Sequence, residues 1–400
     1  MGNHTSKEQL QALQRQQELL MKQNADMAKR LADEQENHKK QHEEHLAQMA
    51  QMMLVLMAGV QTKQTKREKQ LIEIEDVTYD VTEELDRGGF GVVYKAQAQN
   101  NNRWVAIKVM PNSPLIQREI ENEIRFLRLT KKLKLDPHPV IEFFGCKVTP
   151  DHILISLELA QCDILTFWFQ GMDGRSAEER FTFGTIIIMY TLRALTFLER
   201  LNIIHGDIKP QNLVMVQRGD SFAIKLIDFG TVEKMHTARA LMTVEASKAY
   251  TQFFASPEFL KRDSKNLVSR RLHKKSDAWA AGVMFYLLFL RKLPWNDEHE
   301  YQNFVNDSNA PDVVVPGEGG YKAIIELLLK KNPEERSSAK ETLLQMKSHP
   351  VLGVIVAALE EAFYPVDDVC AIKVPDTLKE EIGLNLLNTS LLNIRTSAVF

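Results

Sequence analysis

The stretch Ile204-His205-Gly206-Asp207-Ile208-Lys209-Pro210-Gln211-Asn212 is the most informative part of this chain. It sets a carboxylate, an ammonium group and a carboxamide at fixed steps along one short loop. Asp207 can accept a proton from a hydroxyl group, Lys209 can neutralise a phosphate in transfer, and Asn212 can hold a metal ion. The loop therefore predicts phosphoryl-transfer chemistry.

Three further motifs lie in a set order around this loop. Asp228-Phe229-Gly230 follows it, while Arg87-Gly88-Gly89-Phe90-Gly91-Val92-Val93 and Val105-Ala106-Ile107-Lys108 precede it. By these four motifs the chain resembles the eukaryotic protein kinases of the serine/threonine type, over roughly residues 78–350. The resemblance implies an α+β fold of two lobes, in which a small antiparallel sheet with one key helix is followed by a larger, mainly helical lobe.

Composition and charge limit the class of protein. The 400 residues are 44% hydrophobic, which is enough for a two-lobed domain with extensions. The 50 basic and 53 acidic residues leave a net charge of −3, so there is no electrostatic reason to expect nucleic acid as a partner. The cysteines (Cys146, Cys162, Cys370) have neither disulfide nor zinc spacing, and no secretory signal opens the chain. We therefore expect a cytoplasmic or nuclear protein.

The N-terminal segment, residues 1–72, is expected to be helical. Residues 7–50 contain no proline or glycine, and apolar residues at heptad spacing predict a weak coiled coil, although a solvated helix explains the composition equally well. Residues 47–60 are apolar but shorter than the ~20 residues of a membrane-spanning helix. Residues 7–60 are therefore expected to bind a partner helix or a second copy of the chain.

The first residues, Met1-Gly2-Asn3-His4-Thr5-Ser6-Lys7, fit the pattern for myristoylation of Gly2. The alternative is that Gly2 only makes removal of Met1 easier and carries no lipid. One myristoyl chain binds membranes reversibly, with an association constant on the order of 10⁴ M⁻¹. We therefore expect peripheral membrane contact through Gly2 to need the apolar residues 47–60 and the basic residues of 63–69 as well.

The remaining chain divides into three parts. By the resemblance, the small lobe spans 78–160 and the large lobe 161–350. Residues 115–133 have the composition of a helix within the small lobe, and β-branched and aromatic residues mark its strands. The tail, 351–400, has regular apolar stretches and is expected to dock on the large lobe.

The resemblance implies a site for ATP between the lobes. Lys108 would bind the α- and β-phosphates and pair with a helix glutamate; of Glu119, Glu121 and Glu123, the family pattern matches Glu123. Asp86 stands where the family has its first glycine; a carboxylate near phosphates is mildly unfavourable, but many family members tolerate a change at this position. The implied binding residues are Leu85, Gly88, Gly89, Phe90, Gly91, Val93, Ala106, Lys108, Glu158, Ala160 and Val214. Leu157 would lie behind the adenine ring of ATP.

The resemblance also assigns the chemical groups. Asp207 would orient the attacking hydroxyl as a base, and Lys209 beside it is typical of serine/threonine kinases. His205 is interpreted as core, in a stack of Phe229 with Leu127 and Phe143. The implied catalytic residues are Asp207, Lys209, Lys108 and Glu123, and the implied Mg²⁺ ligands are Asn212 and Asp228.

Two positions depart from the family pattern. Gly206 stands where most kinases carry the arginine that pairs with an activation-segment phosphate. Ser256-Pro257-Glu258 replaces Ala-Pro-Glu, and Glu258 is expected to pair with Arg336. Asp277 follows the pattern and would brace the catalytic loop.

Three functions compete on this evidence. The leading hypothesis is an ATP-dependent serine/threonine protein kinase that acts on protein substrates. The alternative is a pseudokinase scaffold, which Asp86 and Gly206 favour, and a third reading is a coiled-coil adaptor with an incidental kinase-like fold. Every charged group that the chemistry needs is present, so we favour the enzyme.

Overall fold

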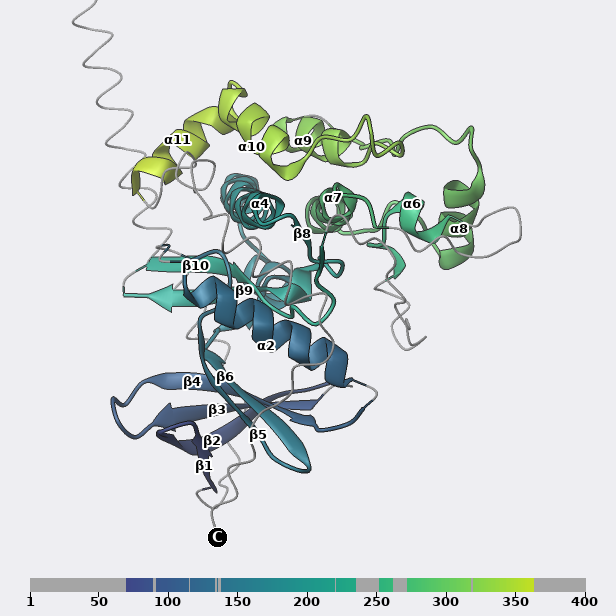
Figure 1. The fold of residues 1–400 in the computed structure, drawn as a ribbon. Coiled ribbons are helices and arrows are strands. Elements are labelled where there is room, and N and C mark those ends of the chain that lie inside the picture. Colours follow the sequence, from purple (N-terminus) through teal and green to yellow (C-terminus); the bar gives the residue numbers. More distant parts are fainter. Residues whose placement is uncertain are drawn as a thin grey trace, which may run out of the picture. The chain divides into compact units, whose positions relative to one another are not determined.

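The computed structural model describes residues 70–88, 91–114, 116–133, 135, 138–219, 221–234, 252–261, 272–317 and 319–362. They form a small lobe built on a six-stranded sheet and a large lobe built on helices (Figure 1). The expected α+β fold of two lobes is therefore confirmed. The predictions for Gly2, for the coiled coil and partner or membrane contact of residues 7–69, and for the tail beyond 362 lie outside the described residues.

The small lobe is an antiparallel sheet with the strand order β1-β2-β3-β4-β6-β5. Its core is a cluster of buried apolar side chains that includes Ile74, Tyr79, Ala96 and Ile107. β-Branched and aromatic residues favour such half-buried strands. The bounds are β1 Gln70–Ile74, β2 Val77–Gly88, β3 Gly91–Ala98, β4 Trp104–Pro111, β5 Phe143–Val148 and β6 His152–Glu158.

Strand β1 corrects the predicted domain boundary, which extended the helical segment to residue 72 and began the small lobe at 78. Residues 70–74 pair antiparallel with β2, from Gln70 opposite Val81 to Ile74 opposite Val77. Ile72 and Ile74 alternate with exposed residues, and this period of two belongs to a strand. The small lobe therefore includes Gln70–Ile74.

Helix α2 (Gln117–Lys131) falls within the range predicted to be helical and packs against β5. Ile120, Glu123 and Leu127 are buried at helical spacing on one face, so the helix presents this face to the lobe interior. Glu123 is the acidic residue on that face. The helix thus carries a carboxylate into the interior of the small lobe.

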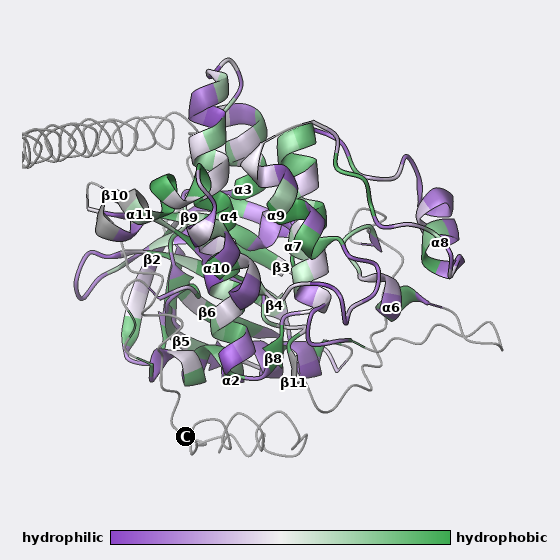
Figure 2. Ribbon diagram, turned by 90° about the horizontal axis from the view of Figure 1, so that it is seen from above, coloured by the Kyte–Doolittle hydropathy of each residue, from purple (hydrophilic) through white to green (hydrophobic). Residues whose placement is uncertain are grey.

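Two long buried helices form the core of the large lobe. Helices α4 (Ala177–Arg200) and α7 (Ser276–Leu290) pack against each other. Helix α4 is long and apolar enough to span a membrane, but residues 182–198 are buried without interruption, so it is a core helix. In Figure 2 hydrophobic residues (green) are frequent on these helices, whereas α8 (Glu298–Asn306) is mostly hydrophilic (purple).

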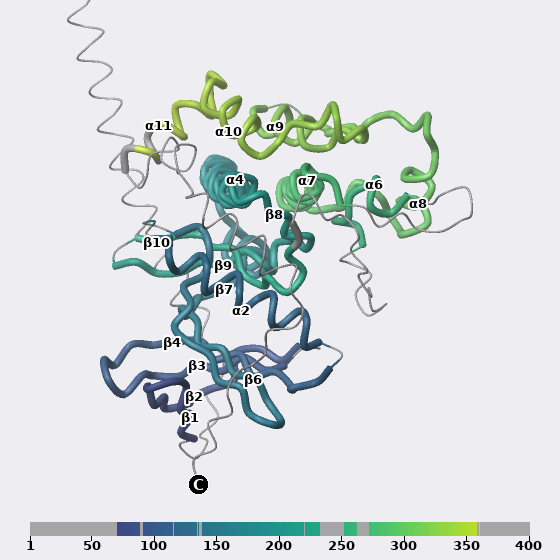
Figure 3. The backbone as a smooth tube through the Cα atoms, in the orientation of Figure 1, coloured from purple at the N-terminus to yellow at the C-terminus, as the bar shows by residue number. Residues whose placement is uncertain are grey.

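Shorter elements complete the large lobe, and the chain enters it from β6 through β7 (Figure 3). Helix α11 packs against α4 and α10, so this part of the tail lies on the large lobe. The bounds are α3 Ile164–Thr166, η1 Phe167–Gly171, η2 Pro210–Asn212, α6 Pro257–Leu260, α9 Gly320–Leu328, α10 Ala339–Ser348 and α11 Leu352–Ala362, with strands β7 Cys162–Asp163, β8 Ile203–Ile204, β9 Leu213–Arg218, β10 Ser221–Leu226 and β11 Glu233–Lys234.

The carboxyl group of Glu199, in the last turn of α4, accepts hydrogen bonds from the first amides of α10. Its Oε1 accepts a hydrogen bond from Ala339 N at 2.8 Å, and its Oε2 accepts one from Lys340 N at 3.3 Å. Burial outweighs these two amides and raises the pKa of Glu199 to about 7. Folding therefore favours the protonated form of this carboxyl group.

The wild-type protein should lose stability relative to Glu199→Gln as the pH rises from 5 to 8. The pKa of the folded state lies above the ordinary value of 4.5, so the proton on Glu199 stabilises the fold fully below about pH 4.5, and this contribution is lost as the pH rises through about 7. Glutamine does not titrate. Urea unfolding should show the difference in unfolding free energy changing by about 2–3 kcal/mol. A difference that is constant across these pH values would contradict the expectation.

Candidate active site

The catalytic loop that follows β8 is held by the first turn of α7. Asp277 Oδ2 accepts a hydrogen bond from His205 N at 2.7 Å, and its Oδ1 accepts one from Gly206 N at 2.9 Å. The ring of His205 is fully buried and meets the ring of Phe229 edge-on, with centroids 5.1 Å apart. The structure thus contains the predicted brace, and it fixes the backbone immediately before Asp207.

Asp207 lies at the centre of a polar cluster within this loop. Its Oδ2 accepts hydrogen bonds from Lys209 Nζ and, at 3.0 Å, from Asn212 Nδ2, which also donates to the Asp207 carbonyl at 2.7 Å. Its Oδ1 is buried and has no hydrogen-bond partner in the described part of the chain. Leaving a buried acceptor without a donor costs free energy. Oδ1 is therefore open to a donor that lies outside the described residues.

Lys108 on β4 lies between two carboxylates. Its Nζ is 2.8 and 3.0 Å from the two carboxylate oxygens of Glu123 on α2, and 3.7 Å from Asp228 Oδ1. Burial disfavours the ammonium form, but the two carboxylates outweigh burial and hold the pKa of Lys108 above its ordinary value. The side chain is therefore a fixed positive charge, and the prediction of Glu123 as its partner is confirmed.

Asp228 contacts Lys108, whereas its neighbour Phe229 is buried among aromatic rings. Asp228 has a left-handed backbone with φ of 65°, which is uncommon outside glycine and marks a functional constraint. Phe229 is fully buried and stacks on Phe126 of α2, with ring centroids 4.4 Å apart. The predicted contact of Phe229 with His205 is present, whereas the stacking on Phe126 was missed. Both contacts help to keep the Asp228 carboxylate on the side of Lys108.

The loop between β2 and β3 requires glycine at its second end. Gly88 and Gly91 face each other across the hairpin, while Gly89 and Phe90 lie outside the described residues. Gly91 has φ of +148°, and a Cβ there would lie 2.2 Å from the Val109 carbonyl oxygen. Only glycine avoids this clash. The hairpin can therefore lie close to the neighbouring strand.

The carboxylate at position 86 lies on the exposed side of this hairpin. Asp86 Oδ1 accepts a hydrogen bond from Arg87 N at 2.8 Å, and Arg87 pairs with Glu84 at 2.7 Å. Leu85 lies at the irregularity in pairing between Glu84 and Asp86. Asp86 is therefore engaged by its own neighbour, which weakens the argument that it obstructs a nucleotide.

The residues predicted to contact adenine come from both lobes. Val93 lies on β3 opposite Lys108, and Ala106 lies on β4 opposite Leu157. Val214 lies on β9 of the large lobe, and Ala160 follows β6 in the segment that links the lobes. The strand pairing thus groups Val93, Ala106 and Leu157 in one part of the small lobe.

Glu158 carries an ion pair that sequence reasoning missed. Its Oε2 accepts from Lys225 Nζ and, at 3.2 Å, from Glu142 N. The side chains of Lys225 and Glu158 are only 4% and 13% exposed. Lys225 lies on β10, three residues before Asp228. The pair therefore joins the segment between the lobes to the strand that leads to Asp228, and its sequence separation of 67 residues leaves no local signal.

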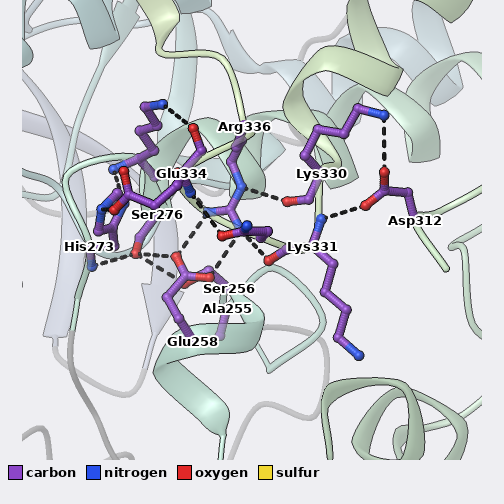
Figure 4. A network of polar contacts seen from close by, with 12 residues as sticks. Ala255, Ser256, Glu258, His273, Ser276, Asp312, Lys330, Lys331, Glu334 and Arg336 are labelled. Atoms are coloured by element: carbon purple, nitrogen blue, oxygen red, sulfur yellow. Dashed lines mark hydrogen bonds and ion pairs between the residues drawn. The ribbon is translucent and has the colours of Figure 1, made fainter. Parts of the chain in front are cut away.

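The activation segment runs from Asp228 to Glu258, and its end is anchored by Arg336 (Figure 4). The guanidinium is fully buried and donates to Glu258 at 2.8 and 3.0 Å, which confirms the predicted pair. Burial alone would raise the pKa of Glu258, but Arg336 holds it below its ordinary value. The other acceptors are the carbonyls of Lys275, Lys330 and Lys331, so all five N–H groups have a partner.

Ser276, in the first turn of α7, is a second anchor for this segment. Its hydroxyl accepts from Ser256 Oγ at 3.0 Å and from His273 N at 2.8 Å, and donates to Glu258 Oε1 at 3.0 Å. Ser256 therefore has a hydrogen bond that an alanine could not make. Residues 235–251 lie outside the described residues; they include Thr251, which by the family resemblance would hydrogen-bond to Asp207 and Lys209.

Comparisons with known proteins agree with this geometry. The protein kinase domain model matches residues 79–350. Calcium-dependent protein kinase 27 of Arabidopsis thaliana is 26% identical over 75% of this chain and 62% of its own length. The carbon catabolite-derepressing protein kinase of Saccharomyces cerevisiae is 29% identical over 66% of this chain and 39% of its own length. Homeodomain-interacting protein kinase 4 of Mus musculus is 29% identical over 58% of this chain and 36% of its own length.

The chain thus spans less than two thirds of the length of each of these relatives. The family model nevertheless covers well over half of the chain, including the hairpin, the ion pair of Lys108 and the catalytic loop. The chain belongs to the protein kinase domain family.

Proposed function

We propose that this protein is an ATP- and Mg²⁺-dependent serine/threonine protein kinase that transfers the γ-phosphate of ATP to a hydroxyl group of a protein substrate. The observation that supports it most is the position of Lys108, whose Nζ lies between Glu123 and Asp228. This contact joins β4, α2 and the start of the activation segment in one arrangement. Such an arrangement has a fixed cation for phosphates beside a carboxylate for a metal ion.

The residues at the site fit Mg²⁺ and a nucleotide. Asn212 donates through Nδ2 to Asp207, so its carbonyl oxygen is left for a metal ion, and Asp228 adds a carboxylate. Within the described residues there is no group of three or more histidine, cysteine or acidic side chains that could hold a metal. This suits Mg²⁺, which is bound through one or two protein oxygens together with phosphates and water. When bound, the ion would neutralise charge on the phosphates.

The residues of the loop would then act on the acceptor. Asp207 Oδ1 would accept a hydrogen bond from the substrate hydroxyl, orient its oxygen towards the γ-phosphorus and take the proton as the new P–O bond forms, while the bond from the γ-phosphorus to the β–γ bridging oxygen breaks and ADP leaves. Lys209, on Oδ2, would keep the carboxylate oriented and neutralise the phosphoryl group in transfer. The pseudokinase alternative is less favoured, because the geometry around Lys108 and Asp207 is complete.

The labelled product should contain phosphoserine or phosphothreonine. Lys209 stands two residues after Asp207, as in the serine/threonine form of this loop, and its ammonium contacts the Asp207 carboxylate. The purified protein is incubated with Mg·[γ-³²P]ATP and a generic basic protein, and the product is hydrolysed in acid. Predominant phosphotyrosine would contradict the specificity, and the absence of any transfer would overturn the proposed function.

Activity should not depend on phosphorylation of the activation segment. Gly206 has no side chain to pair with a phosphate, and the α2 residue beside Gly230 is the acidic Glu119, whose Cβ is 3.4 Å from the position of a Cβ on that glycine. A phosphate adds about −1.5 to −2 charge and needs cationic partners. Protein treated with phosphatase should keep most of the rate of mock-treated protein. A collapse that rephosphorylation of Thr237, Thr243, Ser247 or Tyr250 reverses would contradict this.

A further inference from the structure

Tyr301 connects helix α8 to the segment that ends in Ser256-Pro257-Glu258. Its side chain is fully buried, and its hydroxyl donates a hydrogen bond to the carbonyl oxygen of Ala255. The ring packs against Trp295, with centroids 4.0 Å apart, and faces Phe253 at 6.1 Å. Burial raises the pKa of Tyr301, which favours the protonated hydroxyl that acts as the donor.

Ala255 also lies against β8, the strand that leads into the catalytic loop. Its side chain packs on a buried cluster of Ile204, Phe259 and Leu272. Ile204 is the last residue of β8 and precedes Asp207 by three positions, and a Cβ on Gly206 would lie 3.7 Å from Leu272. The segment 252–256 is therefore held between two elements: the catalytic loop on one side and α8, through Tyr301, on the other.

On the proposed function, the substrate chain lies near this segment. The proposed function requires its hydroxyl to reach Asp207 Oδ1, and an extended chain advances only about 3.3–3.6 Å per residue. The residues beside the acceptor are therefore close to the catalytic loop and to the segment packed on it. The backbone position at Ala255 then sets the surface on which the substrate chain rests.

We propose that Tyr301 is a positioning residue for the protein substrate. Its hydroxyl holds the backbone of residues 252–256 in the position that brings the substrate hydroxyl group to Asp207. This inference rests on the proposed function. Beyond Ala255 the segment is fixed independently, by Ser256 on Ser276 and by Glu258 on Arg336. Tyr301 therefore controls the part of the segment that precedes these anchors and can be changed without removing them.

The test is the Tyr301→Phe variant, which removes one oxygen atom and keeps the packed ring. The KM for a basic protein substrate should rise about two- to tenfold, as expected for one neutral hydrogen bond, while the KM for ATP stays unchanged. Tyr190→Phe is the matched control, because Tyr190 is a buried tyrosine whose hydroxyl donates to the Phe222 carbonyl at 3.5 Å, on β10. Neither KM should change in that variant.

Hydrogen exchange gives a readout that does not depend on activity. Amides of residues 252–261 should exchange faster in Tyr301→Phe than in wild-type protein or Tyr190→Phe. Unchanged exchange, an equal rise in both KM values, or a variant that fails to fold would each overturn the inference. A wild-type protein that transfers no phosphoryl group would overturn the proposed function, and with it the substrate role of Tyr301. Faster exchange in Tyr301→Phe would in that case still support the hydrogen bond itself.

Discussion

Asp207→Asn is expected to lower the turnover number about 10²–10⁴-fold with saturating Mg·ATP and protein substrate. Asparagine has nearly the same shape, so the loop and its brace from Asp277 should remain. It lacks the negative charge that attracts Lys209, and its amide cannot take up the proton of the attacking hydroxyl. The loss should appear in kcat, because the group acts on the reacting atoms rather than on nucleotide binding.

The control for this variant is Asp173→Asn. Asp173 is 72% exposed and forms a surface ion pair with Arg291 at 3.4 Å, so the same chemical change there should leave kcat unaltered. A single-turnover assay of both proteins separates the chemical step from product release. A kcat of Asp207→Asn close to that of Asp173→Asn would show that Asp207 is not the base.

Arg336→Ala is expected to lower the free energy of unfolding by about 3–5 kcal/mol, because it leaves a buried carboxylate without its partner. Glu258 would lose both short contacts, and the carbonyls of Lys275, Lys330 and Lys331 would lose their donors. Chemical denaturation followed by circular dichroism measures the change. The end of the activation segment should be the first region to show faster hydrogen exchange.

Arg291→Ala is the matched control for this prediction. It also removes a guanidinium that pairs with a carboxylate, but its side chain is 47% exposed, so the expected change is below about 1 kcal/mol. Equal losses in the two variants would show that burial of the Glu258–Arg336 pair does not determine its contribution. A loss of less than about 1 kcal/mol for Arg336→Ala would contradict the prediction itself.

The parts of the site that could be predicted are those with local signals. Asp207, Lys209 and Asn212 lie on one short loop, so their spacing along the chain nearly determines their spacing in three dimensions. Lys108 and Glu123 lie on different elements, and only the family pattern distinguished Glu123 from Glu119 and Glu121. The two-lobed fold could be predicted for the same reason, because its motifs mark the sheet, the helix and the catalytic loop.

The parts that sequence reasoning missed are contacts between distant elements. Glu158 and Lys225 are 67 residues apart, and Tyr301 and Ala255 are 46 apart. Whether such side chains meet depends on how strands and helices pack, which periodicity does not report. The first two residues of strand β1 were assigned to the helical segment because Gln70 and Leu71 have no alternation of their own and become part of a strand by pairing with β2.

The two anchors on the first turn of α7 have a mechanical consequence. Asp277 holds the amides before Asp207, while the neighbouring Ser276 holds Ser256 and Glu258 at the end of the activation segment. Proton transfer depends on the separation between the base and the acceptor, not on where either lies in the molecule. Because adjacent residues of α7 hold the catalytic loop and the end of the activation segment, a displacement of this helix would move the two together and change the distance between them little.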